Sequence, residues 1–112
     1  MKCNDQEVIF AVVNAGFAED VMEIARNQGA RGGTILDARG VVWEEAAEFF
    51  GITIHREKEI LMIVVPKDIR SQVLTAIYKE SGKKAGAFVF SLPVSDVAGL
   101  APVAAPGEEE LG

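Results

Sequence analysis

Cysteine, histidine and tryptophan each occur only once in this chain of 112 residues. A single cysteine, Cys3, excludes an internal disulfide and a four-cysteine zinc site, and it suits a reducing compartment. Polar residues follow Met1 and Lys2, where a signal peptide would have an apolar stretch, so we expect a cytoplasmic protein. The longest apolar run, residues 60–66, is far too short to cross a membrane, so we do not expect a membrane-embedded chain.

Positive charge is also scarce. The chain has 11 Lys and Arg residues against 17 Asp and Glu residues, which gives a net charge of −6 at pH 7. It has no basic stripe with interleaved aromatic side chains, so nucleic acid is not an expected partner. The hydrophobic fraction of 49% is too high for a disordered chain, and the length fits a single domain.

Hydrophobic periodicity predicts four strands. Runs of apolar residues, many of them β-branched, mark these strands at residues 7–13, 33–39, 60–65 and 87–92. The runs at 7–13 and 60–65 are continuously apolar, so we expect these two strands at the centre of a sheet. Asn14 follows the first strand as a turn or cap residue.

Two segments between the strands have a helical period instead. The first predicts a helix over residues 17–28, ended by Gly29. The second predicts a helix after Pro66, with Asp68 as its cap and Gly82 at its end. Helices therefore follow the first and third predicted strands.

The remaining segments are less regular. Residues 43–50 predict a short helical turn or a loop with an apolar side, and residues 52–55 a half-buried strand. From Pro93 onward the apolar pattern weakens. We therefore expect one domain over residues 1–100 and a mobile acidic tail over residues 101–112.

The order strand, helix, strand, strand, helix, strand is that of an α+β, ferredoxin-like βαββαβ domain. Right-handed crossovers place both helices on one face of its antiparallel sheet. No further element of the chain is predicted to cover the other face. Oligomerisation is therefore the physical expectation.

Four segments stand out by their order and spacing: residues 29–40 (GARGGTILDARG), 63–69 (IVVPKDI), 81–86 (SGKKAG) and 87–94 (AFVFSLPV). Together they resemble the PII nitrogen-regulatory signal-transduction proteins. The resemblance extends to about residue 100, and it is closest to divergent members with a short T-loop, the loop between the second and third strands.

The resemblance implies a non-enzymatic homotrimer. In that family, adenine nucleotides (AMP, ADP or ATP) bind in clefts between subunits. The T-loop then docks on a transporter, an enzyme or a regulator in nitrogen regulation. The effector would thus control a partner protein by reshaping the loop after the second strand.

The resemblance also implies a set of ligand-binding residues, which come from three parts of the chain. Thr34 matches a threonine near the adenine, and Arg39 and Gly40 lie at the near base of the T-loop, with Lys58 at its far base. The turn before the last strand would cradle phosphates through Gly82, Lys83, Lys84 and Gly86.

Plainer roles remain open for several of these residues. Lys83 and Lys84 follow a helix, where they could simply compensate its dipole. Arg39 could be a surface charge. The glycines around residues 31–34 could cradle a phosphate or form an ordinary helix-to-strand turn.

This sequence departs from the family pattern in its basic residues. Ala87 replaces a phosphate-binding lysine, and residues 95–102 contain none of the arginines found there, which favours a mono- or diphosphate. Glu44 falls near the glutamine that helps bind 2-oxoglutarate, which makes that ligand doubtful. No tyrosine or serine lies between Gly40 and Lys58, so covalent modification of the usual tyrosine is excluded.

Two alternatives are weighed against this interpretation. One is a metal- or other small-ligand-binding trimer of similar fold, the divalent-cation tolerance type, in which His55 acts with Glu57 or Glu59. The other is an acylphosphatase-like enzyme. That chemistry needs an arginine in the loop after the first strand, and residues 14–17 (NAGF) contain none.

Overall fold

Two long central strands organise the sheet of the computed structural model, which describes residues 5–41 and 57–99. β1 (Gln6–Asn14) and β3 (Glu57–Pro66) pair antiparallel along the whole of β1. The register places Gln6 opposite Pro66 and Asn14 opposite Lys58. The strands predicted as central are therefore confirmed as central.

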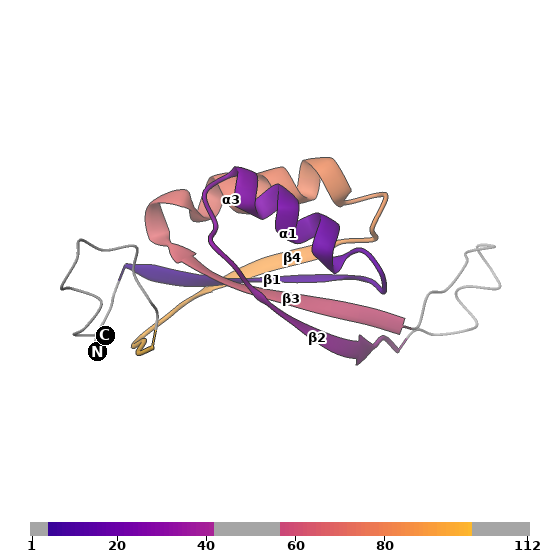
Figure 1. The fold of residues 1–112 in the computed structure, drawn as a ribbon, viewed down its shortest axis with the longest axis horizontal. Coiled ribbons are helices and arrows are strands. Elements are labelled where there is room, and N and C mark those ends of the chain that lie inside the picture. Colours follow the sequence, from indigo (N-terminus) through magenta and orange to yellow (C-terminus); the bar gives the residue numbers. More distant parts are fainter. Residues whose placement is uncertain (1–4, 42–56, 100–112) are drawn as a thin grey trace.

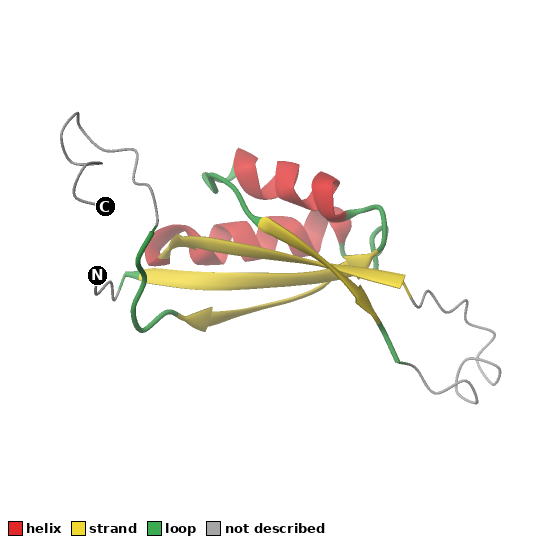
Figure 2. Ribbon diagram, turned by 60° about the horizontal axis from the view of Figure 1, so that its bottom comes forward, coloured by secondary structure: helices red, strands yellow, loops and turns green. Residues whose placement is uncertain are grey.

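The outer strands and the helices complete a two-layer domain. β2 (Thr34–Arg39) pairs with β3, and β4 (Phe88–Pro93) pairs with β1, so the order is β2-β3-β1-β4 and every pair is antiparallel. α1 (Ala18–Asn27) and α3 (Lys67–Ser81) lie side by side on one face (Figures 1 and 2). This arrangement confirms the predicted ferredoxin-like fold. Within the described ranges, no helix is long and apolar enough to cross a membrane.

The core lies between the helices and one face of the sheet. Alternate residues of a strand point to opposite faces, so every second side chain of β1, and of β3 from Leu61 to Val65, is buried beneath the helices. Full burial of a large aliphatic side chain contributes about 1.5–3 kcal/mol. The fully buried large side chains are Ile9, Val13, Val21, Leu61, Ile63, Val65, Val73 and Ile77.

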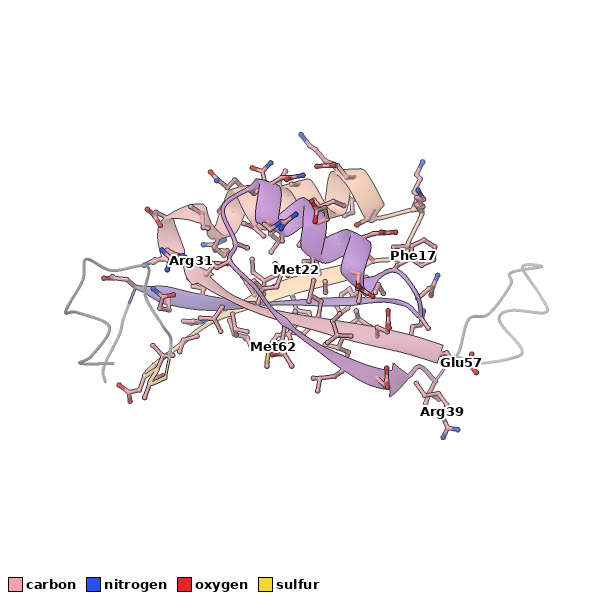
Figure 3. All side chains as sticks on the ribbon, viewed as in Figure 1. Phe17, Met22, Arg31, Arg39, Glu57 and Met62 are labelled. Atoms are coloured by element: carbon pink, nitrogen blue, oxygen red, sulfur yellow. The ribbon has the colours of Figure 1, made fainter. Side chains whose placement is uncertain are left out.

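The other face of the sheet is also apolar, and no described element covers it. Its side chains come from all four strands, and Figure 3 shows one of them, Met62, pointing away from the helices. The ring of Phe10 stacks on that of Phe90 with centroids 5.2 Å apart, and Phe88 remains 64% exposed. We call this surface the open face; it consists of Val8, Phe10, Val12, Leu36, Ile60, Met62, Val64, Phe88, Phe90 and Leu92.

The observed ends of α1 and α3 can be compared with the stop and cap residues predicted from the sequence. Gly29 is confirmed as the stop of α1: with φ of 110° its amide reaches the Arg26 carbonyl, and the Ala30 amide reaches the Ala25 carbonyl. Asp68 as the cap of the second helix is wrong. α3 begins at Lys67 with Pro66 in the cap position and no side-chain cap bond, which places Asp68 within the first turn.

Other predictions lie outside the described residues. These are the helical turn or loop at 43–50, the strand at 52–55 and the acidic tail at 101–112. They remain predictions.

Gly33, directly before β2, lies very close to the backbone of β3. A Cβ at this position would lie 2.9 Å from the Met62 carbonyl oxygen, 3.0 Å from Leu61 Cδ1 and 3.2 Å from Met22 Sδ. The first of these atoms belongs to the backbone of β3 and moves only if the sheet moves. At neighbouring Gly32, an added Cβ would meet nothing within 4 Å.

We therefore expect Gly33→Ala to lower the free energy of unfolding by about 1–3 kcal/mol, because the methyl group overpacks the β2–β3 contact. Gly32→Ala is the matched control and should change it by no more than about 0.5 kcal/mol. Denaturant unfolding of both variants measures the difference. Equal effects would contradict the close approach at Gly33.

Candidate functional site

The site is built around Asn14, the last residue of β1. Its amide donates to the Ala85 carbonyl at 2.9 Å, and its own carbonyl accepts from the Phe17 amide at 3.2 Å. Its side-chain Oδ1 accepts a hydrogen bond of 2.6 Å from the Lys58 ammonium at the start of β3. One residue thus joins the end of β1, the start of α1, the start of β3 and the turn before β4.

The turn before β4 carries two exposed lysines, Lys83 and Lys84. The Ala85 amide bonds to the Ser81 carbonyl at 2.9 Å, and the Ala87 amide bonds to the Gly82 carbonyl at 3.0 Å. Within the described part of the chain, no main-chain carbonyl accepts from the amides of Lys83, Lys84 and Gly86. Lysine ammonium groups and unbonded amides together are suited to bind an anion.

Gly86 brings this turn against Asn14. It has φ of 61°, and a Cβ there would lie 2.8 Å from Asn14 Nδ2. A side chain at this position would therefore be strained and would also displace the Asn14 amide. The turn and Asn14 fit together because this residue is glycine.

Glu59 of β3 supplies the cap that α1 lacks in its own sequence. The cap position of α1 is Phe17, which makes no side-chain cap bond. Instead, Glu59 Oε1 accepts from the Gly16 amide at 2.9 Å and from the Ala18 amide at 3.1 Å. A carboxylate at a helix N-terminus also interacts favourably with the helix dipole. The Ala18 amide at the start of α1 and the Gly16 amide before it are thus already partnered.

A cleft of about 350 Å³ opens beside this junction. Figure 3 shows two of its lining residues, Phe17 and Glu57, at the same end of the sheet. The cleft combines an aromatic side chain with charges of both signs. Its lining residues are Asn14, Ala15, Phe17, Glu57 and Lys84.

Several of the predicted site residues come together at this end of the sheet. Lys58 bonds to Asn14, and the turn that carries Gly82, Lys83, Lys84 and Gly86 contacts the same asparagine.

Arg39 and Gly40 end β2 at the same end of the sheet. Arg39 is exposed and pairs with Glu57 across the β2–β3 ladder. Figure 3 shows both side chains beside the point where the description of the chain breaks off. Arg39 lies on the edge strand β2, one strand further from the lysine turn than Lys58 of β3.

Thr34 is not brought to this cluster. It begins β2 opposite Met62, near the middle of β3, and it is exposed. The two central strands separate β2 from β4, so Thr34 and the lysine turn lie on opposite edges of one protomer.

The glycine-rich segment before Thr34 connects α1 to β2. Its first two amides, those of Gly29 and Ala30, already bond to carbonyls of α1. Arg31 lies at the opposite end of the sheet from Arg39 (Figure 3). These two bonds do not involve the amides of residues 31–33, so both roles left open by the sequence stay open.

The sequence did not identify Asn14 and Glu59 in these roles. Their partners are 41 to 44 positions away in the chain, and no local pattern encodes such contacts. The only signal was the charged run at 57–59, directly before an apolar strand. For the metal-binding alternative, His55 lies outside the described residues, and no group of three potential ligands occurs within them.

Fold and site define a class: a ferredoxin-like α+β domain with an uncovered apolar sheet face and a lysine-bearing turn at one end of the sheet. The family model described as nitrogen regulatory protein P-II matches residues 6–102, so the chain belongs to the P-II family. Proteins of this family are generally trimeric, non-enzymatic signalling proteins that regulate partner proteins. No curated protein matches the chain in sequence.

Solved structures agree with this family. A PII-like signalling protein from Thermus thermophilus has a TM-score of 0.65 and 18% identity, covering 84% of this chain and 90% of that one. Arabidopsis thaliana PII bound to citrate has a TM-score of 0.62 and 27% identity, covering 85% and 80%. CPII of Thiomonas intermedia bound to ADP, AMP and acetate has a TM-score of 0.62 and 11% identity, covering 83% and 89%.

The cap formed by Glu59 can be tested by stability. Glu59→Ala leaves two amides at the start of α1 without their carboxylate, so we expect a loss of about 1–2 kcal/mol in the free energy of unfolding. Glu23→Ala is the control, because its ion pair with Arg26 is more than half exposed and contributes little. Thermal unfolding compares the two; a Glu59→Ala loss no larger than that of Glu23→Ala would argue against the cap.

Proposed function

We propose that this protein is a non-enzymatic cytoplasmic sensor that binds an adenine nucleotide between subunits and regulates a partner protein through the loop after β2. The observation that carries the proposal is the lysine turn. Exposed ammonium groups and unbonded amides lie together there, next to Lys58. Phosphate oxygens are the ligands that such a turn binds best.

The balance of charge favours a nucleotide with few phosphates. Lys84 and Glu57 line the same cleft, Lys58 bonds to Asn14, which also lines it, and Lys83 is next to Lys84 in the turn. Each further phosphate would bring more negative charge toward the Glu57 carboxylate, with few cations to pair it. We therefore expect AMP or ADP to bind more tightly than ATP, and CPII, a structural neighbour, has been solved with ADP and AMP.

The position of Thr34 supports binding between subunits. In one protomer it lies on the opposite edge of the sheet from the lysine turn. A site that uses both needs the β2 edge of one copy near the β4 edge of another. The open face offers the apolar surface for such an assembly, since a contiguous apolar patch of this kind is costly in water. The proposed assembly is a homotrimer.

Regulation of a partner would act through the base of the loop. Arg39, Gly40 and Glu57 border residues 42–56, and Lys58 links that border to Asn14. A ligand changes the loop only to the extent that it binds one loop state more tightly than another. Contact with Lys58 is a direct way to provide that difference.

Nucleotide binding is tested by calorimetry with AMP, ADP and ATP, each with and without magnesium. We expect measurable binding that weakens roughly tenfold in Lys83→Ala and in Arg39→Ala, since each loses a charged contact to phosphate. Lys79→Ala, within α3, is the control and should bind as the unchanged protein does. Absence of binding for all three nucleotides would refute the proposal.

Assembly through the open face is tested by sedimentation. Phe10→Asp places a charge in the middle of the open face, so we expect it to convert trimers to monomers at micromolar concentration. Tyr78→Asp alters another exposed aromatic, 67% accessible on α3, and should leave the trimer intact. Circular dichroism verifies that both variants are folded. A trimeric Phe10→Asp protein would rule out this interface.

A further inference from the structure

We infer that Asn14 is a specificity and positioning residue of the proposed ligand site: it holds the Lys58 ammonium beside the lysine turn through a neutral partner, so that the charge of Lys58 stays available to an anionic ligand. This inference rests on the proposed nucleotide function and assigns one part of it to a residue outside the predicted set.

The contact between Asn14 and Lys58 is a hydrogen bond from an ammonium group to a neutral acceptor. The 2.6 Å bond from Lys58 Nζ to Asn14 Oδ1 joins two partly buried side chains that face each other across the β1–β3 ladder. An amide oxygen fixes the direction of the ammonium group but carries no net charge. A carboxylate in its place would fix the same direction and cancel the charge.

Asn14 also contacts the lysine turn. The backbone amide of Asn14 bonds to the Ala85 carbonyl, and the side-chain amide lies against Gly86. The neighbouring lysine, Lys84, lines the same cleft as Asn14. The Asn14 side chain thus contacts both the Lys58 ammonium, which it bonds, and Gly86 of the lysine turn.

The two glutamates that flank Lys58 also bond to the turn after β1. The Glu59 carboxylate accepts from two amides of the β1–α1 turn, and the Glu57 carbonyl accepts from the Ala15 amide at 3.1 Å. The chain thus fixes all three residues 57–59 to the turn that begins at Asn14. In that arrangement Glu59 is satisfied by backbone donors, and within residues 5–41 and 57–99 the side-chain partner of Lys58 is the neutral amide of Asn14.

Two substitutions of Asn14 separate the effect of neutralising Lys58 from the effect of losing its hydrogen-bond acceptor. Asn14→Asp retains a hydrogen-bond acceptor for Lys58 but neutralises its charge, whereas Asn14→Ala removes the acceptor. We expect Asn14→Asp to unfold at the same denaturant concentration as the unchanged protein, or a higher one, and yet to bind AMP and ADP roughly tenfold more weakly. Asn14→Ala should lower both stability and affinity.

A double-mutant cycle with Lys58→Met tests whether Asn14 affects nucleotide binding through Lys58. If Asn14 acts through Lys58, Asn14→Ala should weaken nucleotide binding in the unchanged background and have little further effect in Lys58→Met. Gln72→Ala is the control for loss of an amide hydrogen bond, because Gln72 donates to the Gln28 carbonyl between the two helices, away from the site. It should bind nucleotide as the unchanged protein does.

The outcomes are distinguishable. Nucleotide binding by the unchanged protein, with unaltered affinity in Asn14→Asp or additive effects in the cycle, overturns the role of Asn14 and leaves the proposed function standing. No nucleotide binding by the unchanged protein overturns both. Weaker binding in the Asn14 and Lys58 variants, with non-additive effects in the cycle and Gln72→Ala unaffected, supports the inference.

Discussion

The pairing of β1 with β3 is the constraint on which the rest of the molecule depends. Both strands are apolar on both faces, and their long register fixes which side chains point up and which point down. Two helices can cover only one of the two faces. The same pairing that builds the core beneath α1 and α3 therefore also creates the open face. The β1–β3 pairing thus accounts both for the core of the fold and for the apolar surface that favours assembly.

The antiparallel register also decides where the candidate site lies. It brings the C-terminal end of β1 beside the N-terminal end of β3, and β4 enters the sheet on the other side of β1. Three chain segments far apart in sequence meet at Asn14 for this reason. The site is thus a consequence of topology, and its chemistry depends on the few polar residues at that end, above all Lys58, Glu59 and the lysine turn.

Much of this fold was predictable from periodicity, because β1 and α1 each bury a regular set of apolar residues. The start of β3 was not. Residues 57–59 are charged, and they are in a strand because they pair with Asn14 and the end of β2, which local sequence does not encode. The same limit applies to the site: family resemblance predicted Lys58 and the turn, but not Asn14 or Glu59. Asp68 failed as a cap because α3 starts one residue earlier.

The distribution of bonds at the site also suggests how a signal could travel. β2 is an edge strand whose residues are mostly exposed, so it transmits little force by packing. The start of β3 is different, because each of residues 57–59 bonds to the turn after β1, and Asn14 in turn contacts the lysine turn. Under the proposed function, a ligand that moves the lysine turn would strain or release these bonds. The path from ligand to loop would then run more directly through β3 than through β2, with Asn14 as the residue that contacts both Lys58 and the lysine turn.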